Sequence, residues 1–457
     1  MLPQLRKLER RYAEELAVVS VHSPKFPTER ETPALRQAVL RLRIEHPVLN
    51  DREFAYWRRF GARAWPTLYF VDPRGNVIGR HEGELTAEAV EPLLDDWIAQ
   101  YRREGALDGG ALPLERAPAV EGAPPTALSF PGKVHYDAAG DLLFIADSNH
   151  DRIIAARLDG TVEQVVGGSA AGFADGAPET ARFDQPQGMA VAEDADGRAL
   201  FVADLENHAI RRIDLETWET TTVAGTGEQA RTYPQPRAAA GAPLNSPWDL
   251  AAGDGGVLYI AMAGFHQLWT LDLRAGTIGP WAGSMREGIE DGPRASAELA
   301  QPSGLSVGPG GVAFADSESN AVRLAHPGEG GRVETLIGSG LFDFGDADGA
   351  QGVARLQHPL DVAWLPTGEG EPELYVADTF NHKIKQVYPR TQQVRTVCGG
   401  LGDAGGGLAA SRFNEPGGLC AGPGRTLIVA DTNNHRVRVV DLAAGLVRSV
   451  ELRLGEG

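Results

Sequence analysis

The feature that most constrains this chain is a short apolar segment that recurs six times in its second part. The copies begin at Leu143, Leu200, Leu258, Val312, Leu374 and Leu427, 53 to 62 residues apart. A unit of several short alternating strands cannot bury both of its faces alone, so such units must stack around an axis and close a ring. The repeat therefore predicts a six-bladed β-propeller over residues 126–457.

The flanks of these segments also repeat. A proline opens another apolar run ahead of each copy, at Pro131, Pro186, Pro247, Pro302, Pro359 and Pro416. Three copies are followed by an Asn-His pair, ending at His208, His382 and His435. This pattern resembles the NHL repeat over about residues 126–457. Blade one, with Asp147-Ser-Asn-His-Asp151, and blades three and four, around Met262 and Asn320, depart from it at single positions.

Two sets of repeated polar residues could at first sight ligate a metal ion. Because each recurs once per blade at a strand end, we interpret both as structural. We expect the aspartates to form turns by accepting local backbone N–H bonds. The histidines would lie on a ring too wide for a tetrahedral zinc site, and are assigned to packing and hydrogen bonding. The residues concerned are Asp147, Asp204, Asp316, Asp378, Asp431, His208, His382 and His435.

The first hundred residues alternate helical and strand patterns. Helices are predicted near 2–12, 33–44, 53–60 and 86–102, and strands near 16–22, 46–50, 68–71 and 77–82. This order, with Trp65-Pro66-Thr67 leading into a strand, resembles the thioredoxin fold. The resemblance implies a cis bond before Pro66, which is energetically tolerable only at proline. The predicted fold class is thus α/β plus all-β, a partial thioredoxin-like fold followed by the propeller.

The combination of both domains resembles the family of NHL repeat-containing protein 2. The resemblance implies a strand and a Cys-x-x-Cys motif ahead of the first helix, which this sequence lacks, so we expect an N-terminally truncated chain whose domain covers 1–104. Its two cysteines, Cys398 and Cys420, lie in apolar strand runs of the propeller. Dithiol exchange needs a low-pKa thiolate beside a resolving thiol, so we expect no thioredoxin-type activity as given.

Composition narrows the classes of partner. The chain has a net charge of −19, and residues 1–110 carry 17 basic and 17 acidic residues, so the whole excess lies in the second part. Such a surface repels phosphate backbones and disfavours nucleic-acid binding. The Asp-Gly loops at 175, 291 and 348 are expected to make one propeller face acidic, open to a basic partner or a cation.

The remaining expectations concern setting and boundaries. No membrane span or signal peptide is visible, and the low cysteine content favours a cytoplasmic protein, here expected to be a monomer without cofactor or metal. A linker is predicted over residues 105–125. The sequence allows two ways of closing the ring. The first and last blades could pack face to face, or Leu112–Leu114 could add an edge strand.

No catalytic signature is present, and the leading hypothesis is a protein-interaction scaffold. Its candidate partner surface comprises His22, Phe26, Trp65 and Pro66, with Trp65 and Phe26 forming an apolar patch. One alternative is a thiol–disulfide oxidoreductase in a full-length form with an upstream Cys-x-x-Cys. Another is a metal-dependent propeller hydrolase or lyase with its metal in the central channel.

Overall fold

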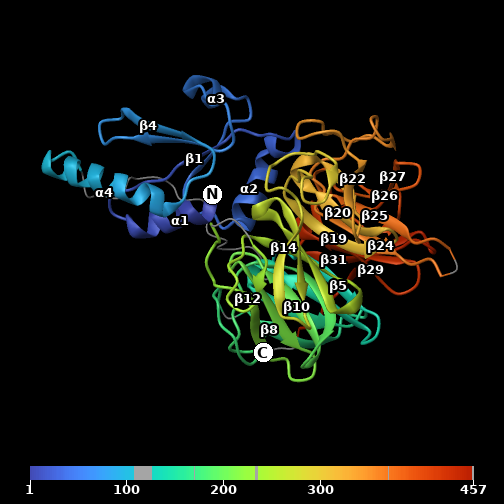
Figure 1. Cartoon of the computed structure of the whole chain (residues 1–457). Coiled ribbons are helices and arrows are strands. Elements are labelled where there is room, and N and C mark those ends of the chain that lie inside the picture. The colour runs from blue at the N-terminus through green and yellow to red at the C-terminus, as the bar shows by residue number, and fades with distance from the viewer. Residues whose placement is uncertain (108–125, 169, 232–234, 369, 455–457) are drawn as a thin grey trace. The chain divides into compact units, whose positions relative to one another are not determined.

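The computed structural model describes residues 1–107, 126–168, 170–231, 235–368 and 370–454. The chain separates into two compact units, Met1–Pro124 and Pro125–Gly457. The first is the thioredoxin-like unit, drawn in blue in Figure 1, and the second is the propeller, drawn in green to red. The predicted linker lies largely outside the described residues, as does the segment Leu112–Leu114.

Over residues 1–107, the thioredoxin-like unit has four α-helices and four short strands. Parallel strands β1 and β2 form one sheet, and the antiparallel hairpin β3–β4 forms another. Thr86 caps α4 by accepting the N–H of Ala89 through its hydroxyl. The bounds are α1 Leu2–Arg11, β1 Ser20–His22, η1 Thr28–Arg30, α2 Thr32–Arg41, β2 Val48–Asn50, α3 Ala55–Phe60, β3 Thr67–Val71, β4 Val77–Glu82 and α4 Ala87–Arg103.

The propeller has six blades, and each contains an antiparallel sheet of four strands in chain order. Blade one comprises β5 Val134–Asp137, β6 Leu142–Asp147, β7 Arg152–Ala156 and β8 Val162–Gly167; blade two β9 Pro186–Asp194, β10 Gly197–Asp204, β11 Ala209–Asp214 and β12 Thr220–Gly225; blade three β14 Pro247–Ala252, β15 Val257–Met262, β16 Gln267–Asp272 and β17 Thr277–Ala282. Blade four comprises β19 Pro302–Gly308, β20 Gly311–Asp316, β21 Ala321–Ala325 and β22 Arg332–Ile337; blade five β24 Asp361–Leu365, β25 Glu373–Asp378, β26 Lys383–Tyr388 and β27 Gln393–Gly399; blade six β29 Pro416–Ala421, β30 Thr426–Asp431, β31 Arg436–Asp441 and β32 Leu446–Val450.

Short 3-10 helices connect the second and third strands of most blades. They span η2 Ser148–His150, η4 Ala263–Phe265, η5 Ser317–Ser319, η6 Thr379–Asn381 and η7 Thr432–Asn434, while η3 Asp254–Gly256 joins β14 to β15. Each of the connectors η2, η4, η5, η6 and η7 is followed directly by a residue with positive φ. The connectors therefore turn the chain sharply at the same place in successive blades.

Four blades contain a short fifth strand that the sequence did not predict. These strands pair with the fourth strand of blades three to six, and they are β13 Arg237–Ala238, β18 Gly292–Pro293, β23 Gly349–Ala350 and β28 Gly406–Gly407. Two of them include the glycine of an Asp-Gly loop. In these loops the aspartate accepts both the N–H and the hydroxyl of a threonine on the fourth strand, as Asp291 does from Thr335 and Asp348 from Thr396. These carboxylates therefore bind the fourth strands of their blades. The expectation of an acidic face had treated them as free surface charges.

Neighbouring blades are joined by one hydrogen bond that recurs at all six seams. A side chain on a residue with positive φ accepts a backbone N–H from the loop that opens the next blade. The acceptor and donor pairs are Asp151–Gln185, His208–Ser246, His266–Gln301, Asn320–His358, His382–Glu415 and His435–Phe130, with distances of 3.0 to 3.3 Å. The last of these pairs joins blade six to blade one.

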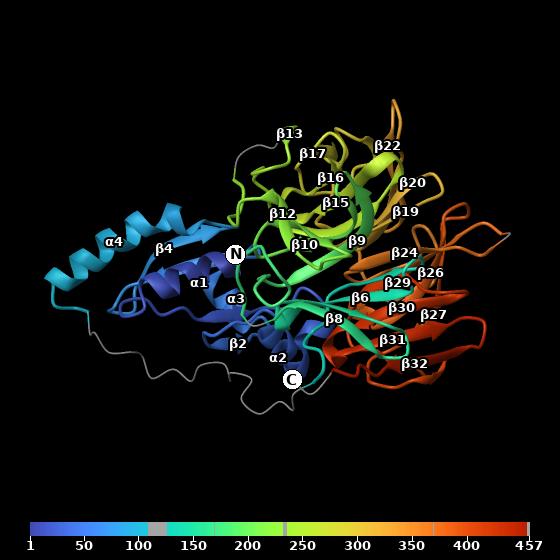
Figure 2. The same cartoon turned by 90° about the horizontal axis from the view of Figure 1, so that it is seen from below.

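The ring closes by face packing between the first and last blades. The first strands pack one against the next around the axis, and β29 packs against β5 (Figures 1 and 2). Leu143, Ile145 and Ile154 share a buried cluster with Val437 and Val439. The hydroxyl of Thr432 donates to the carbonyl of Pro131, and beyond β32 a parallel bridge joins Arg453 to Thr161.

Each seam also holds its own cluster of buried apolar side chains. Phe201, Ile260 and Trp269, for example, lie between blades two and three. Phe144 and Phe183 lie between blades one and two. The apolar core is therefore divided among the seams, and each blade contributes both of its faces.

The seam bond predicts a pH dependence of stability. Burial lowers the pKa of His435 below its ordinary value of about 6.5, and only an imidazole with an unprotonated Nδ1 can accept the Phe130 N–H. The contribution of His435 should be complete above pH 6.5 and be lost as the pH falls below it. His435→Asn should therefore lose less stability than the wild type between pH 7.5 and 5 in urea unfolding.

His435→Ala provides the comparison for this experiment. It leaves a buried N–H without its acceptor and should cost about 1–3 kcal/mol at pH 7.5. The asparagine variant should retain most of that stability, because Asn320 makes the same bond in blade four. Buried aspartates titrate alike in all three proteins and cancel in the comparison. Equal acid sensitivity of the wild type and His435→Asn would contradict the assignment.

Candidate functional site

The recurring strand-end aspartates are fully buried and pair with cations. In blades two, four, five and six the partner lies seven residues further along the chain, in Asp204–Arg211, Asp316–Arg323, Asp378–Lys385 and Asp431–Arg438, with distances of 2.8 to 3.1 Å. In blade one Asp147 pairs with Arg152 at 2.7 Å. In blade three the equivalent residues are Met262 and Trp269, so an apolar contact takes the place of the ion pair.

These contacts correct one detail of the sequence interpretation. The aspartates were expected to accept local N–H groups as turn-formers. They instead accept N–H groups from 16 to 21 residues earlier, such as those of Asp184, Ala300 and Gln357. Burial raises the pKa of Asp204 to about 7 despite the guanidinium of Arg211. The role is structural, but it consists of holding the loop ahead of each blade against the strand end.

The channel of the propeller contains three buried charges from alternate blades. The ammonium of Lys133 lies 3.0 Å from Asp361 Oδ2 and 3.6 Å from Asp249 Oδ2, and it donates to the carbonyl of Leu360 at 2.7 Å. The two aspartates also accept backbone N–H groups of the following blades, those of Leu305 and Leu419. We refer to Lys133, Asp249 and Asp361 as the channel triad.

Glycines occupy the same position in the other three blades, at Gly188, Gly304 and Gly418. A Cβ atom added to Gly188 would lie 2.0 Å from Asp249 Oδ1, and one added to Gly304 would lie 2.4 Å from Asp361 Oδ1. The position nearest the axis therefore alternates between a charged side chain and glycine. Burial raises the pKa of Asp361 to about 7, although the Lys133 charge opposes the rise.

These residues do not fit a channel metal. A lysine ammonium lies between the two carboxylates, where a cation would have to bind. Within the described residues, no group of three or more histidine, cysteine, aspartate or glutamate side chains is arranged to hold a metal ion. His208, His382 and His435 lie in separate seams, each engaged with a backbone N–H.

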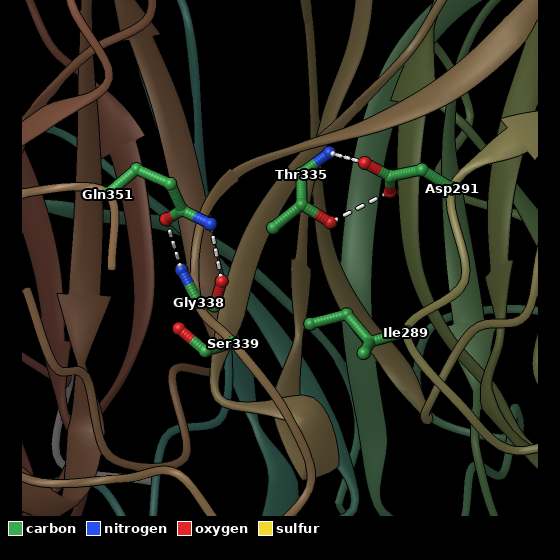
Figure 3. A pocket seen from close by; sticks show the side chains of 6 residues that line it. All are labelled: Ile289, Asp291, Thr335, Gly338, Ser339 and Gln351. Carbon is green, nitrogen blue, oxygen red and sulfur yellow. Dashed lines mark hydrogen bonds between the residues drawn. The ribbon is translucent and has the colours of Figure 1, made fainter.

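A hollow of about 240 Å³ lies near the outer strands of blades four and five. Figure 3 shows that three of its polar side chains bind other parts of its wall: Asp291 accepts twice from Thr335, and the Gln351 amide bonds both backbone groups of Gly338. Asp291 also pairs with Arg323 at 3.0 Å. Because these groups already bind one another, we interpret the hydrogen bonds in the wall of this hollow as structural.

In the thioredoxin-like unit, the Trp65–Pro66 bond is cis, as the sequence predicts. Trp65 remains 47% exposed although two contacts hold its indole ring. Its Nε1 donates to the carbonyl of Ser23 at 2.8 Å, and the ring stacks on Trp57 with a centroid distance of 4.3 Å. A large aromatic side chain is thus fixed in orientation while one side of it faces solvent.

Asp51 determines where Trp57 lies. Its carboxylate accepts the N–H groups of Tyr56 and Trp57 at 3.0 and 2.9 Å and the hydroxyl of Ser23 at 2.9 Å. Burial alone would raise the pKa of Asp51, but these donors hold it below its usual value. Asp51 therefore ties the start of α3 to the Ser23 loop. Asp51 is absent from the residues predicted from the sequence, although an aspartate just ahead of a short aromatic helix is a recognisable signal.

The predicted apolar patch of Trp65 and Phe26 is wrong for Phe26, which is buried. Phe26 is only 3% exposed, and the N–H groups of Lys25 and Phe26 both bind Glu29 Oε2 at 2.9 Å. The exposed aromatic residues of this unit besides Trp65 are Tyr56 and Phe60.

The other two candidate residues have structural contacts. His22 is half-buried in β1, its carbonyl accepts the Asp51 N–H, and within the described chain its buried Nε2 has no hydrogen-bond partner. The carbonyl of Pro66 accepts the N–H of Gly83 at 2.8 Å. The structure therefore leaves Trp65 as the exposed member of the predicted set.

Both cysteines lie in strands of the propeller. Burial raises the pKa of the Cys398 thiol to about 12 and also raises that of Cys420. They are not joined by a disulfide and lie in strands of different blades. Among the described residues, no helix is both long enough and apolar enough to cross a bilayer.

Comparison with known proteins agrees with both parts of the fold. Residues 3–98 match the model of the thioredoxin-like domain, and residues 413–440 match that of the NHL repeat. NHL repeat-containing protein 2 of Gallus gallus is 39% identical over 97% of the chain, and that of Homo sapiens is 38% identical over 98%. The chain belongs to the family of NHL repeat-containing protein 2.

The chain spans 64% of the Gallus gallus family member and 65% of the human one. It is also 38% identical to the chloroplastic protein SUPPRESSOR OF QUENCHING 1 of Arabidopsis thaliana, over 97% of the chain and 43% of that protein. Among solved structures, an auxiliary nutrient binding protein of Bacteroides ovatus aligns with a TM-score of 0.52 at 15% identity, covering 71% of this chain and 70% of that one. At this identity the match shows the fold alone.

The channel triad predicts a large effect of removing its cation. Lys133→Met leaves Asp249 and Asp361 buried without compensation and should lower the free energy of unfolding by about 3–5 kcal/mol, measured by urea unfolding at pH 8. Lys133→Met combined with Asp361→Asn should recover part of that loss, because one uncompensated charge is then removed. A double variant less stable than Lys133→Met would contradict the proposed balance of charges.

Proposed function

We propose that this chain is a protein-interaction scaffold in which a rigid propeller is coupled to a partner-binding surface on the thioredoxin-like unit. The observation that carries the proposal is the indole of Trp65, which is held by Ser23 and Trp57 and still 47% exposed. Aromatic side chains of this kind supply much of the binding energy of protein interfaces, since they bury a large area at little entropic cost.

The propeller supports the same proposal through its rigidity. Its channel is spanned by the channel triad, its repeated aspartates are paired with cations, and its repeated histidines bind backbone. The polar side chains that could have served chemistry are thus engaged in holding blades together. Loops at the ends of such a ring offer a large surface that is already ordered before a partner arrives.

The first test concerns Trp65 directly. Trp65→Ala should reduce the recovery of bound partner proteins at least several-fold in quantitative co-precipitation from the source cells, because it removes the exposed ring without disturbing the propeller. Leu93→Ala is the matched control, since Leu93 is a comparably exposed apolar residue on α4 of the same unit. Unchanged recovery with Trp65→Ala would refute the proposed docking role.

The second test concerns redox chemistry. We propose that the chain as given has no thiol–disulfide exchange activity, since burial raises the pKa of both thiols and thiolates are the reactive form. An insulin reduction assay with dithiothreitol should show the rate of the reductant alone. A rate that rises with protein concentration, and that Cys398→Ser or Cys420→Ser abolishes, would overturn this part of the proposal.

A further inference from the structure

We infer that the exposed surface around Trp65 recognises an acidic segment of a partner protein, an inference that rests on the scaffold function proposed above. The surface combines three exposed aromatic residues with three arginines of α3 and of the loop that follows it. We call it the aromatic–arginine surface, and its members are Tyr56, Phe60, Trp65, Arg58, Arg59 and Arg63.

The local charge differs sharply from that of the chain. Residues 54–71 contain these three arginines and no aspartate or glutamate, whereas the whole chain has a net charge of −19. Several exposed arginines elsewhere in the same unit bind carboxylates: Arg74 lies 2.6 Å from Glu104, and Arg102 lies 2.7 Å from Glu15. Within the described residues, Arg58, Arg59 and Arg63 have no such side-chain partner. Their charges are available to an external anion.

Helical geometry places charge beside the aromatic rings. Tyr56 and Phe60 are four residues apart on α3, so they lie on one face, and Arg59, three residues after Tyr56, borders the same face. Phe60 packs on Tyr69 with ring centroids 5.1 Å apart, and the Tyr69 hydroxyl donates to the Phe60 carbonyl at 2.8 Å. This contact holds Phe60 in place, and Trp65 is held by its contact with Trp57 of the same helix.

This combination suits carboxylates next to apolar groups. A guanidinium presents a planar fork of donors that matches a carboxylate in two parallel hydrogen bonds. Tyrosine, tryptophan and arginine are also the residues most enriched among those that dominate interface energies. A segment of a partner protein that carries aspartates or glutamates around an apolar side chain would satisfy both halves of the surface.

The acidic charge of the rest of the chain favours a protein rather than a nucleic acid as the ligand of this surface. Residues 111–457 carry 26 basic and 45 acidic residues, so a long phosphate backbone would be repelled wherever it extended along the propeller. A short acidic segment places its charges only where the arginines are. Debye screening limits the repulsion that such a segment feels from acids more than about 10 Å away.

The test uses the whole chain and a fluorescein-labelled peptide rich in glutamate around a single phenylalanine, followed by fluorescence anisotropy at low salt. The charge-reversal variant Arg58→Glu/Arg59→Glu/Arg63→Glu should weaken binding at least about tenfold. The matched control is Arg10→Glu/Arg36→Glu/Arg103→Glu, which changes net charge equally at three exposed arginines of the same unit. It should change binding less than about twofold, and circular dichroism should show both variants folded.

Three results would overturn the inference. Equal loss of binding in both triple variants would indicate only a net-charge effect. Undiminished binding of the same peptide with glutamine in place of glutamate would remove the acidic requirement. Tighter binding of a single-stranded oligonucleotide, lost in Arg58→Glu/Arg59→Glu/Arg63→Glu, would assign the surface to nucleic acid.

The two proposals, the scaffold function and the acidic partner, can be refuted independently. If Trp65→Ala abolishes co-precipitation but the peptide does not bind, the docking surface stands and its acidic partner does not. If the peptide binds as described but Trp65→Ala leaves co-precipitation unchanged, the arginines recognise acids without being the route of partner capture.

Discussion

The propeller depends on one hydrogen bond that recurs at every seam, between a side-chain acceptor and the backbone N–H that opens the next blade. The acceptor must meet two conditions at once. It lies on a residue with positive φ, where most side chains are disfavoured, and it must present an unprotonated lone pair. Aspartate, asparagine and histidine tolerate that backbone conformation best and carry an acceptor, and they are the residue types found at all six positions. The histidine of the repeat is thus explained without any metal.

Near these seams, the buried aspartates of the strand ends are paired with buried cationic side chains. Four blades use an aspartate and a cation seven residues apart, and the apolar pair Met262 and Trp269 replaces them in blade three. In blade three, buried apolar side chains thus occupy the positions that an ion pair occupies in those four blades. Ion pairs of this kind add less net stability than their number suggests, since desolvation offsets much of the attraction.

Much of this arrangement could be predicted from the sequence. The period of the apolar segments indicated six blades, and the alternation of patterns in residues 1–104 indicated the helices and strands of the thioredoxin-like unit. The side-chain contacts could not be predicted, because they join residues whose proximity exists only in the closed ring. Lys133 and Asp361 are far apart in sequence and belong to no local motif. Phe26 was placed with Trp65 in the candidate surface but is buried, and the bonds that Glu29 makes to its loop gave no signal in the sequence.

The alternation of charge and glycine along the channel has a consequence for how such a ring can change in size. A charged residue at this position needs a neighbour without a Cβ, since the carboxylates of Asp249 and Asp361 fill the room that a side chain at Gly188 or Gly304 would take. Deleting or duplicating a single blade would place two charged residues or two glycines in neighbouring blades. Two charged residues side by side would clash, and two glycines would leave a void. Rings built on this rule are therefore expected to gain or lose blades in pairs, so that a pair of blades is the unit of change.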